Sequence, residues 1–258
     1  MKQAVTGILI VLLMTGCAST FKQQRDLSRP MVALGMSKLE QNDIQGALIE
    51  LRRALQANPN DPEVYYGLSL AYWKSGKFDK AIENVDKALE HSDRLGLEHP
   101  GLRSETYNLK GIILLGEGKY DAAIEAFNKS LEGELYRTPE YSLYNISSIY
   151  LEKNEYDKAL SYAQKALEYN PHYAPAWEIL AKILTQQGKY TEAIEALNHA
   201  LTEYPGFTEA HWEIATLFIL TGNRAKARHH LEEVIRLDPR GLFGALAEEK
   251  LQEMGLRK

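Results

Sequence analysis

Small and bulky apolar residues recur along most of the chain in a fixed order. Alanines mark the pattern most clearly, because they return at intervals of 34, 42, 36, 34 and 34 residues, at Ala47, Ala81, Ala123, Ala159, Ala193 and Ala227. Around each alanine, bulky apolar residues stand at steps of three and four, which is the spacing of one face of an α-helix. A period of this length predicts helix pairs whose open apolar faces are buried by stacking.

The pattern divides the chain into six repeats and a terminal segment. We expect repeats at residues 28–61, 62–95, 104–137, 140–173, 174–207 and 208–241. Two insertions, near Leu95–Arg103 and Arg137–Glu140, account for the two longer intervals and are expected to be loops. Residues 242–258 carry apolar residues on one side, such as Leu246 and Leu251, and predict a helix that caps the array. The predicted fold is all-α.

Signature residues of a known helix-turn-helix unit stand at matching places. The first helix of the second repeat has Tyr65, Leu68, Ser69 and Tyr72, and that of the fifth has Trp177, Leu180, Ala181 and Leu184. Prolines, which cannot continue a helix, close repeats at Pro59, Pro171, Pro205 and Pro239. The chain resembles the tetratricopeptide repeat over Ser28–Gly241. This resemblance implies a right-handed superhelix, an α-solenoid, of six repeats with a capping helix.

The first residues have the pattern of an export signal. Lys2 precedes a mostly apolar run from Ala4 to Met14, which is too short to span a bilayer. Residues 1–16 are therefore predicted to be a cleaved signal peptide. The stretch from Met14 to Cys17 resembles a bacterial lipobox, with Met14 where leucine is usual. The alternative is that Cys17, the chain's single cysteine, is incidental.

The lipobox resemblance implies a lipid anchor. Cys17 would carry three acyl chains such as palmitate, and two or more chains suffice for stable membrane attachment. Bacterial lipoproteins retained at the inner membrane commonly have Asp after the cysteine, whereas Ala18 and Ser19 stand here. The resemblance therefore implies the periplasmic face of the outer membrane. Residues 17–27 are mostly polar and are expected to be the lipidated N-terminus and a linker.

Charge and motifs disfavour several classes of function. The net charge is −5, from 30 Lys plus Arg against 35 Asp plus Glu, which argues against a nucleic-acid binder. The sequence holds no phosphate-binding loop, nucleophile elbow, zinc-protease motif or dinucleotide fingerprint. We therefore expect neither catalysis nor a cofactor.

Histidines provide the remaining candidate chemistry. His91 and His99 lie near Glu90, Asp93 and Glu98, but their spacing matches no standard metal site. An enzyme using these histidines would need a bound metal, and a solvated loop is the simpler interpretation. His229 and His230 are neighbours on a predicted helix and point about 100° apart, so we expect them on the surface and expect no metal site.

The predicted binding site is the concave groove of the solenoid, lined by the first helix of each repeat. Steps of three and four residues along that helix select one face. Its candidate partner-binding residues are Val32, Met36, Leu39, Tyr66, Leu70, Trp73, Ile112, Tyr141, Tyr144 and Trp212, and Asn108, Leu115, Leu151, Glu178, Lys182, Thr216 and Ile219 share the face. Exposed apolar and aromatic strips mark partner sites, although each side chain could instead pack only against its neighbours. The composition favours an apolar partner segment.

The overall organisation resembles the tetratricopeptide lipoproteins of type IV pilus assembly, the pilotins. The resemblance rests on Cys17, on six repeats after a short linker, and on the junction Ser130–Glu140. It implies a protein that assists the localisation and assembly of an outer-membrane secretin. The competing hypothesis is an envelope scaffold that docks peptidoglycan enzymes or other periplasmic complexes.

Overall fold

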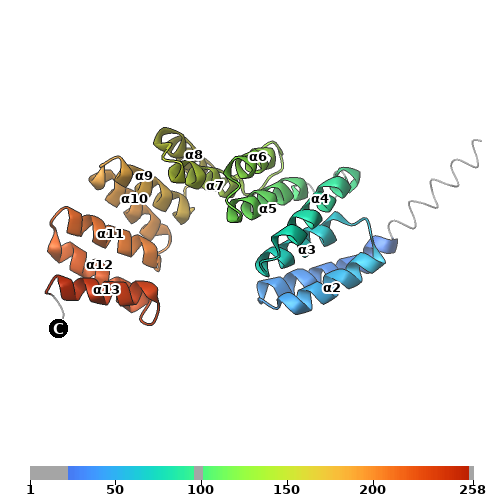
Figure 1. Ribbon diagram of the computed structural model, residues 1–258, viewed down its shortest axis with the longest axis horizontal. Helices are drawn as coiled ribbons and strands as arrows, with labels where there is room; N and C mark the ends of the chain where they lie inside the picture. Colours follow the sequence, from blue (N-terminus) through green and yellow to red (C-terminus); the bar gives the residue numbers. More distant parts are fainter. Residues whose placement is uncertain (1–22, 96–100, 256–258) are drawn as a thin grey trace, which may run out of the picture. The chain divides into compact units, whose positions relative to one another are not determined.

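The computed structural model describes residues 23–95 and 101–255, and these residues form α-helices joined by short connections, without a β-strand (Figure 1). Cys17, the expected signal peptide and His99 lie outside the described residues. The chain divides into two compact units, with unit 1 ending at Arg137 and unit 2 beginning at Thr138.

Unit 1 is built from antiparallel helix pairs. Its helices are an N-terminal helix at residues 23–40, α2 at Ile44–Ala57, α3 at Pro62–Lys74, α4 at Phe78–Leu95, α5 at Leu102–Gly116 and α6 at Tyr120–Leu131. The strongest packing is within pairs, α3 with α4 and α5 with α6, and consecutive pairs join through α2 with α3 and α4 with α5. The apolar stripe of each pair is thus covered by the next pair.

Unit 2 repeats the same arrangement and adds a terminal helix. Its helices are α7 at Pro139–Glu152, α8 at Tyr156–Tyr169, α9 at Ala174–Gln186, α10 at Tyr190–Glu203, α11 at Thr208–Leu220, α12 at Arg224–Leu237 and α13 at Leu242–Glu253. α13 packs on α12 and α11, where Ala247 and Leu251 meet Ala215, Leu231 and Val234. The predicted all-α solenoid of helix pairs is confirmed.

One backbone motif joins the two helices of each pair. The second residue after the first helix has a positive φ in every case, between 59° and 79°, at Asn42, Gly76, Gly118, Asn154, Gly188 and Gly222. After α3, the Gly76 N–H donates to the Trp73 carbonyl and the Lys77 N–H to the Tyr72 carbonyl, both at 2.9 Å. These two bonds form a Schellman motif, which stops the helix and turns the chain back. Glycine, or asparagine, suits this turn because other residues are strained there.

The recurring alanines lie where each second helix is buried. All six are fully buried on the second helix of their pair. Opposite them, two first helices carry serines whose hydroxyls bond across the contact: Ser69 Oγ donates to the Ala81 carbonyl at 2.9 Å, and Ser147 Oγ to the Ala159 carbonyl at 2.8 Å. A larger residue at either place would separate the helices.

The structure corrects three expected boundaries. Residues 23–27 are helical, although the segment 17–27 was expected to be a linker. The reason is local: these residues tolerate helix well, and buried Ser28 ties the helix to α3 by donating to Asp61 Oδ2 at 3.0 Å. Both predicted insertion loops also end earlier than expected, because α5 starts at Leu102 and α7 at Pro139. Pro139 suits a helix start because its missing N–H would have no partner there.

Candidate binding surface

The first helices of unit 1 share a face of half-buried apolar side chains. We call this surface, made by Met36, Tyr66, Leu70, Trp73 and Ile112, the unit 1 face. Four of these residues, all but Ile112, pack their inner atoms against the buried cluster of the unit and leave their outer atoms accessible. All five are half-buried rather than fully covered, and their role in binding a partner stays a prediction.

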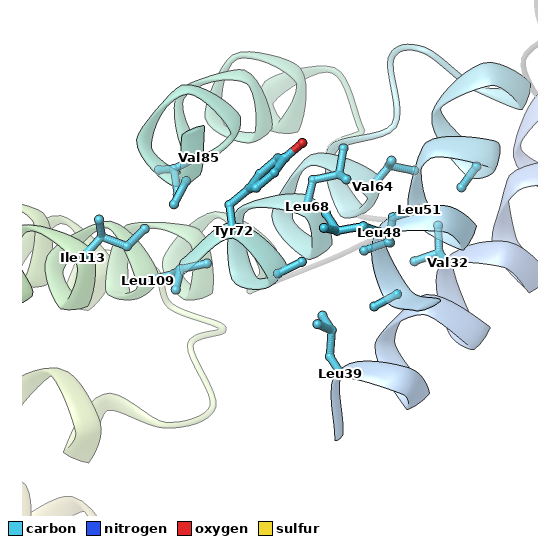
Figure 2. Close-up of a cluster of buried hydrophobic side chains, with 14 residues drawn as sticks. Val32, Leu39, Leu48, Leu51, Val64, Leu68, Tyr72, Val85, Leu109 and Ile113 are labelled. Carbon is cyan, nitrogen blue, oxygen red and sulfur yellow. The ribbon is translucent and has the colours of Figure 1, made fainter. Parts of the chain in front are cut away.

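Two predicted members of the groove are core residues instead. Val32 is 6% exposed and Leu39 is 2% exposed, and Figure 2 shows both within the buried cluster of unit 1. They occupy the same places on their helix as Tyr66 and Trp73 do on α3. At these places neighbouring residues bury the short side chains of valine and leucine. The longer rings of tyrosine and tryptophan extend beyond these neighbours and stay partly exposed. The expectation that Val32 and Leu39 are exposed is wrong.

Tyr66 is the polar group on the unit 1 face. Burial, with a smaller contribution from the nearby carboxylate of Glu105, raises the pKa of Tyr66 to about 12. Burial also raises the pKa of Glu105, while the guanidinium of Arg137 opposes that shift. Tyr66 is therefore neutral at physiological pH and keeps a hydroxyl that can donate a hydrogen bond.

Three tyrosines gather on unit 2. Tyr141 is 42% exposed, and the ring of Tyr173 lies 5.1 Å from that of Tyr141 and 5.7 Å from that of Tyr144, measured between centroids. Burial raises the pKa of Tyr173 and of Tyr144, so both phenols stay neutral. The sequence analysis missed Tyr173 because it precedes α9 and lies off the first-helix stripe. Its place directly after the closing Pro171 and His172 was the available signal.

Beside the tyrosines, α9 and α11 hold a cluster of charges. Lys182 Nζ lies 2.5 Å from Glu178 Oε1 and 3.3 Å from Glu213 Oε1. Glu178 is 6% exposed, and burial raises the pKa of Glu213 to about 7, against the opposing effect of Lys182. Burial lowers the pKa of Lys182, but Glu213 and Glu178 outweigh it, so the net shift is upward. Glu213 was not predicted because it stands next to the stripe, beside Trp212.

A cavity opens next to this cluster. It has a volume of about 210 Å³ and is lined by Lys182, Thr185, Gln186, Trp212, Glu213, Thr216 and Leu217. Trp212 is backed by the ring of Phe243 from α13, with 6.1 Å between centroids. We call the surface of Tyr141, Tyr144, Tyr173, the charge cluster and this cavity the unit 2 face.

Two of the described histidines, His211 and His230, lie against each other. His230 is half-buried rather than on the surface as expected, because α12 turns it toward α11, where its Nδ1 lies 3.0 Å from Nδ1 of buried His211. His211 Nε2 also lies 3.4 Å from the carbonyl oxygen of Pro205. In residues 23–95 and 101–255, no group of three or more His, Cys, Asp or Glu side chains is arranged to hold a metal ion. The same residues include no helix that is both long and apolar enough to cross a membrane.

Stacked helix pairs with accessible apolar faces define an α-solenoid interaction scaffold. Family models described as tetratricopeptide repeats match residues 35–76, 61–133, 144–206 and 184–248. The chain therefore belongs to the tetratricopeptide-repeat family, whose members are protein-interaction scaffolds.

Relatives and solved structures agree with this family. The Hsp70-Hsp90 organizing protein of Triticum aestivum is 26% identical over 209 residues, which are 80% of this chain and 34% of that protein. Three of the curated relatives are much longer, and the chain spans 16% to 42% of their lengths.

Two bacterial pilus proteins share the fold over nearly their whole lengths. PilF of Pseudomonas aeruginosa is similar with a TM-score of 0.74 and 18% identity, over 88% of this chain and 99% of that chain. PilW, a type IV pilus biogenesis factor, is similar with a TM-score of 0.73 and 18% identity, over 85% and 97%. At this identity the likeness concerns the fold.

Proposed function

We propose that this protein is a membrane-anchored scaffold of the bacterial envelope that assists the outer-membrane localisation and assembly of a type IV pilus secretin. In this proposal the protein is not an enzyme. Lipid on Cys17 attaches it to the periplasmic face of the outer membrane, and its first-helix faces hold an apolar segment of the secretin.

One observation carries the binding part of the proposal. Tyr66, Leu70 and Trp73 lie on successive turns of α3 and are half-buried, so they form a partly accessible strip of largely apolar side chains on one face of the helix. Water is displaced favourably from such a strip when an apolar partner covers it, and aromatic residues are common anchors in interfaces. The pilus context is supported by the shared fold with PilF and PilW, which extends over nearly all of both proteins.

Anchoring is tested by Cys17→Ser. We expect mass spectrometry of the parent protein to find an N-terminus at Cys17 with attached lipid, because lipobox processing makes the cysteine the first residue. The Cys17→Ser variant should leave the membrane fraction or stay unprocessed. A parent protein that begins elsewhere, or that carries no lipid on Cys17, would contradict the anchor.

The pilus role is tested in a deletion strain. We expect the secretin to remain monomeric there, twitching to be lost, and both to return with the parent gene. Normal secretin rings in the deletion strain, together with altered peptidoglycan synthesis, would instead support the alternative of a scaffold for peptidoglycan enzymes.

A further inference from the structure

The cavity on the unit 2 face is the size of one side chain. Its volume of about 210 Å³ is below the roughly 300 to 1,000 Å³ of pockets that take small molecules. Trp212 and Leu217 line it with apolar surface, Thr185, Gln186 and Thr216 with polar groups, and Lys182 and Glu213 with charges. A long side chain with an apolar stem and a polar end matches this lining.

The charges beside the cavity are not balanced. Two largely buried carboxylates, Glu178 and Glu213, share the single ammonium of Lys182. Two buried carboxylates that share one counter-ion are costly, because a single ammonium neutralises only one of the two negative charges. Burial accordingly raises the pKa of Glu213 to about 7, so this carboxyl is partly protonated at neutral pH.

Of the two carboxylates, only Glu213 borders the cavity. Glu178 is 6% exposed and pairs with Lys182 from the preceding turn of α9, whereas Glu213 lines the cavity next to Trp212. The lining thus offers a cation the carboxylate of Glu213 and the indole of Trp212, and the ammonium of Lys182, which also borders the cavity, is already paired with Glu178 at 2.5 Å.

We infer that this cavity is a subsite for one arginine side chain of the protein segment bound to unit 2, with Glu213 as its counter-ion and Trp212 as its stacking wall. The guanidinium is planar, stacks on aromatic rings and bonds to carboxylates through paired N–H groups, whereas the ammonium of lysine is more strongly hydrated. The guanidinium favours the ionised form of Glu213, so that two cations then face two carboxylates. The inference rests on the proposed function, because it places the arginine in the protein partner proposed there.

The test uses the whole protein and two small probes. N-acetyl-arginine methylamide and N-acetyl-citrulline methylamide have nearly the same shape, but only the first carries a charge. We expect the arginine probe to shift the Trp212 indole N–H resonance in a saturable way, and the citrulline probe to bind about tenfold more weakly or not at all. The resonance is assigned with Trp212→Phe, which separates it from Trp73 and Trp177.

Two matched variants locate the counter-ion. Glu213→Gln keeps the shape of the side chain and should weaken the arginine probe about tenfold. Glu209→Gln makes the same change at an exposed position of the same helix and should leave binding unchanged. Equal binding of both probes, unchanged binding by Glu213→Gln, or no saturable shift with the arginine probe would each overturn the inference.

The result is separable from that of the proposed function. If the secretin binds the parent protein but the arginine probe does not, only the subsite is wrong. If the arginine probe binds as expected but the secretin does not, the subsite is supported and the proposed partner is wrong.

Discussion

In the first helix of every pair, one position holds only glycine, serine or alanine: Gly35, Ser69, Gly111, Ser147, Ala181 and Ala215. At the two glycines of this set, the structure shows why the residue must be small. A Cβ atom added at Gly111 would lie 2.5 Å from Cε1 of Phe127, and one added at Gly35 would lie 2.7 Å from Cγ of Leu51. The small residue on one helix therefore makes room for the large residue on the other.

Gly111→Ala tests this close contact. Phe127 is fully buried and cannot move away freely, so we expect the variant to lose about 1 to 3 kcal/mol in free energy of unfolding. The control is Gly116→Ala, at the end of the same helix, where an added Cβ meets nothing within 4 Å. Urea titration should find the control as stable as the parent or up to about 1 kcal/mol more stable. Equal stabilities of the two variants would mean that the contact is looser than described.

His230 makes stability depend on pH. Burial, together with neighbouring His211 and His229, lowers the pKa of His230 to about 4 from its ordinary value of 6.5. In the unfolded chain His230 therefore takes up a proton as the pH falls below 6.5. In the folded chain His230 takes up this proton only near pH 4. This contribution to stability is complete above pH 6.5 and is lost as pH falls toward 4.

His230→Gln should flatten this part of the pH profile. Because His230 is only half-buried, solvent screening reduces the expected difference between pH 7.5 and pH 5 to about 1 to 2 kcal/mol. Urea unfolding at both values measures it, with exposed His229→Gln as the control. Glu213 contributes with the opposite sign, but it is the same in each variant and cancels in the comparison. A His230→Gln profile parallel to that of the parent would contradict the assignment.

At the scale of elements, the helix pairs follow from a strong local pattern. A 34-residue period, alanines at the close contacts and glycine or asparagine at the turn all favour the same helix-turn-helix unit, so sequence alone predicts the fold. The binding surface is less predictable. Val32 and Tyr66 stand at equivalent places, and whether each stays accessible depends on whether its side chain is long enough to extend beyond the neighbouring residues. Tyr173 and Glu213 belong to the unit 2 face only because of how the helices pack. That Cys17 carries a lipid anchor stays a prediction.

The capping helix α13 offers a sharp test of element packing. Leu251 is 2% exposed in the cluster with Leu231 and Val234, whereas Leu242 of the same helix is 70% exposed. We expect Leu251→Ala to lower the free energy of unfolding by about 2 to 5 kcal/mol, because it leaves a cavity. Leu242→Ala should change it by less than about 0.5 kcal/mol. Thermal unfolding of both variants measures these changes. A larger loss of stability from Leu242→Ala than from Leu251→Ala would mean that α13 packs through its other side.

At the scale of the whole molecule, the two units carry faces of different chemistry. The unit 1 face is apolar, with Tyr66 as its polar group, whereas the unit 2 face combines tyrosines with the buried charges around Lys182. A partner that uses both faces would need apolar anchors in one part and a cationic side chain in another. Such a requirement selects for a particular sequence more strongly than an apolar strip alone does.

The central claim, that the first-helix faces bind the partner, is tested most directly by isothermal titration of the purified secretin into the protein. The comparison is between the parent, Tyr66→Ala with Trp73→Ala, and a control with Tyr120→Ala and Tyr169→Ala, which removes two exposed aromatic rings from second helices. Circular dichroism establishes that all three are equally helical. We predict that the Tyr66 and Trp73 variant loses about 2 kcal/mol or more of binding free energy, roughly thirtyfold in affinity, and that the control binds like the parent. Parent-like affinity of a fully folded Tyr66 and Trp73 variant would contradict the claim.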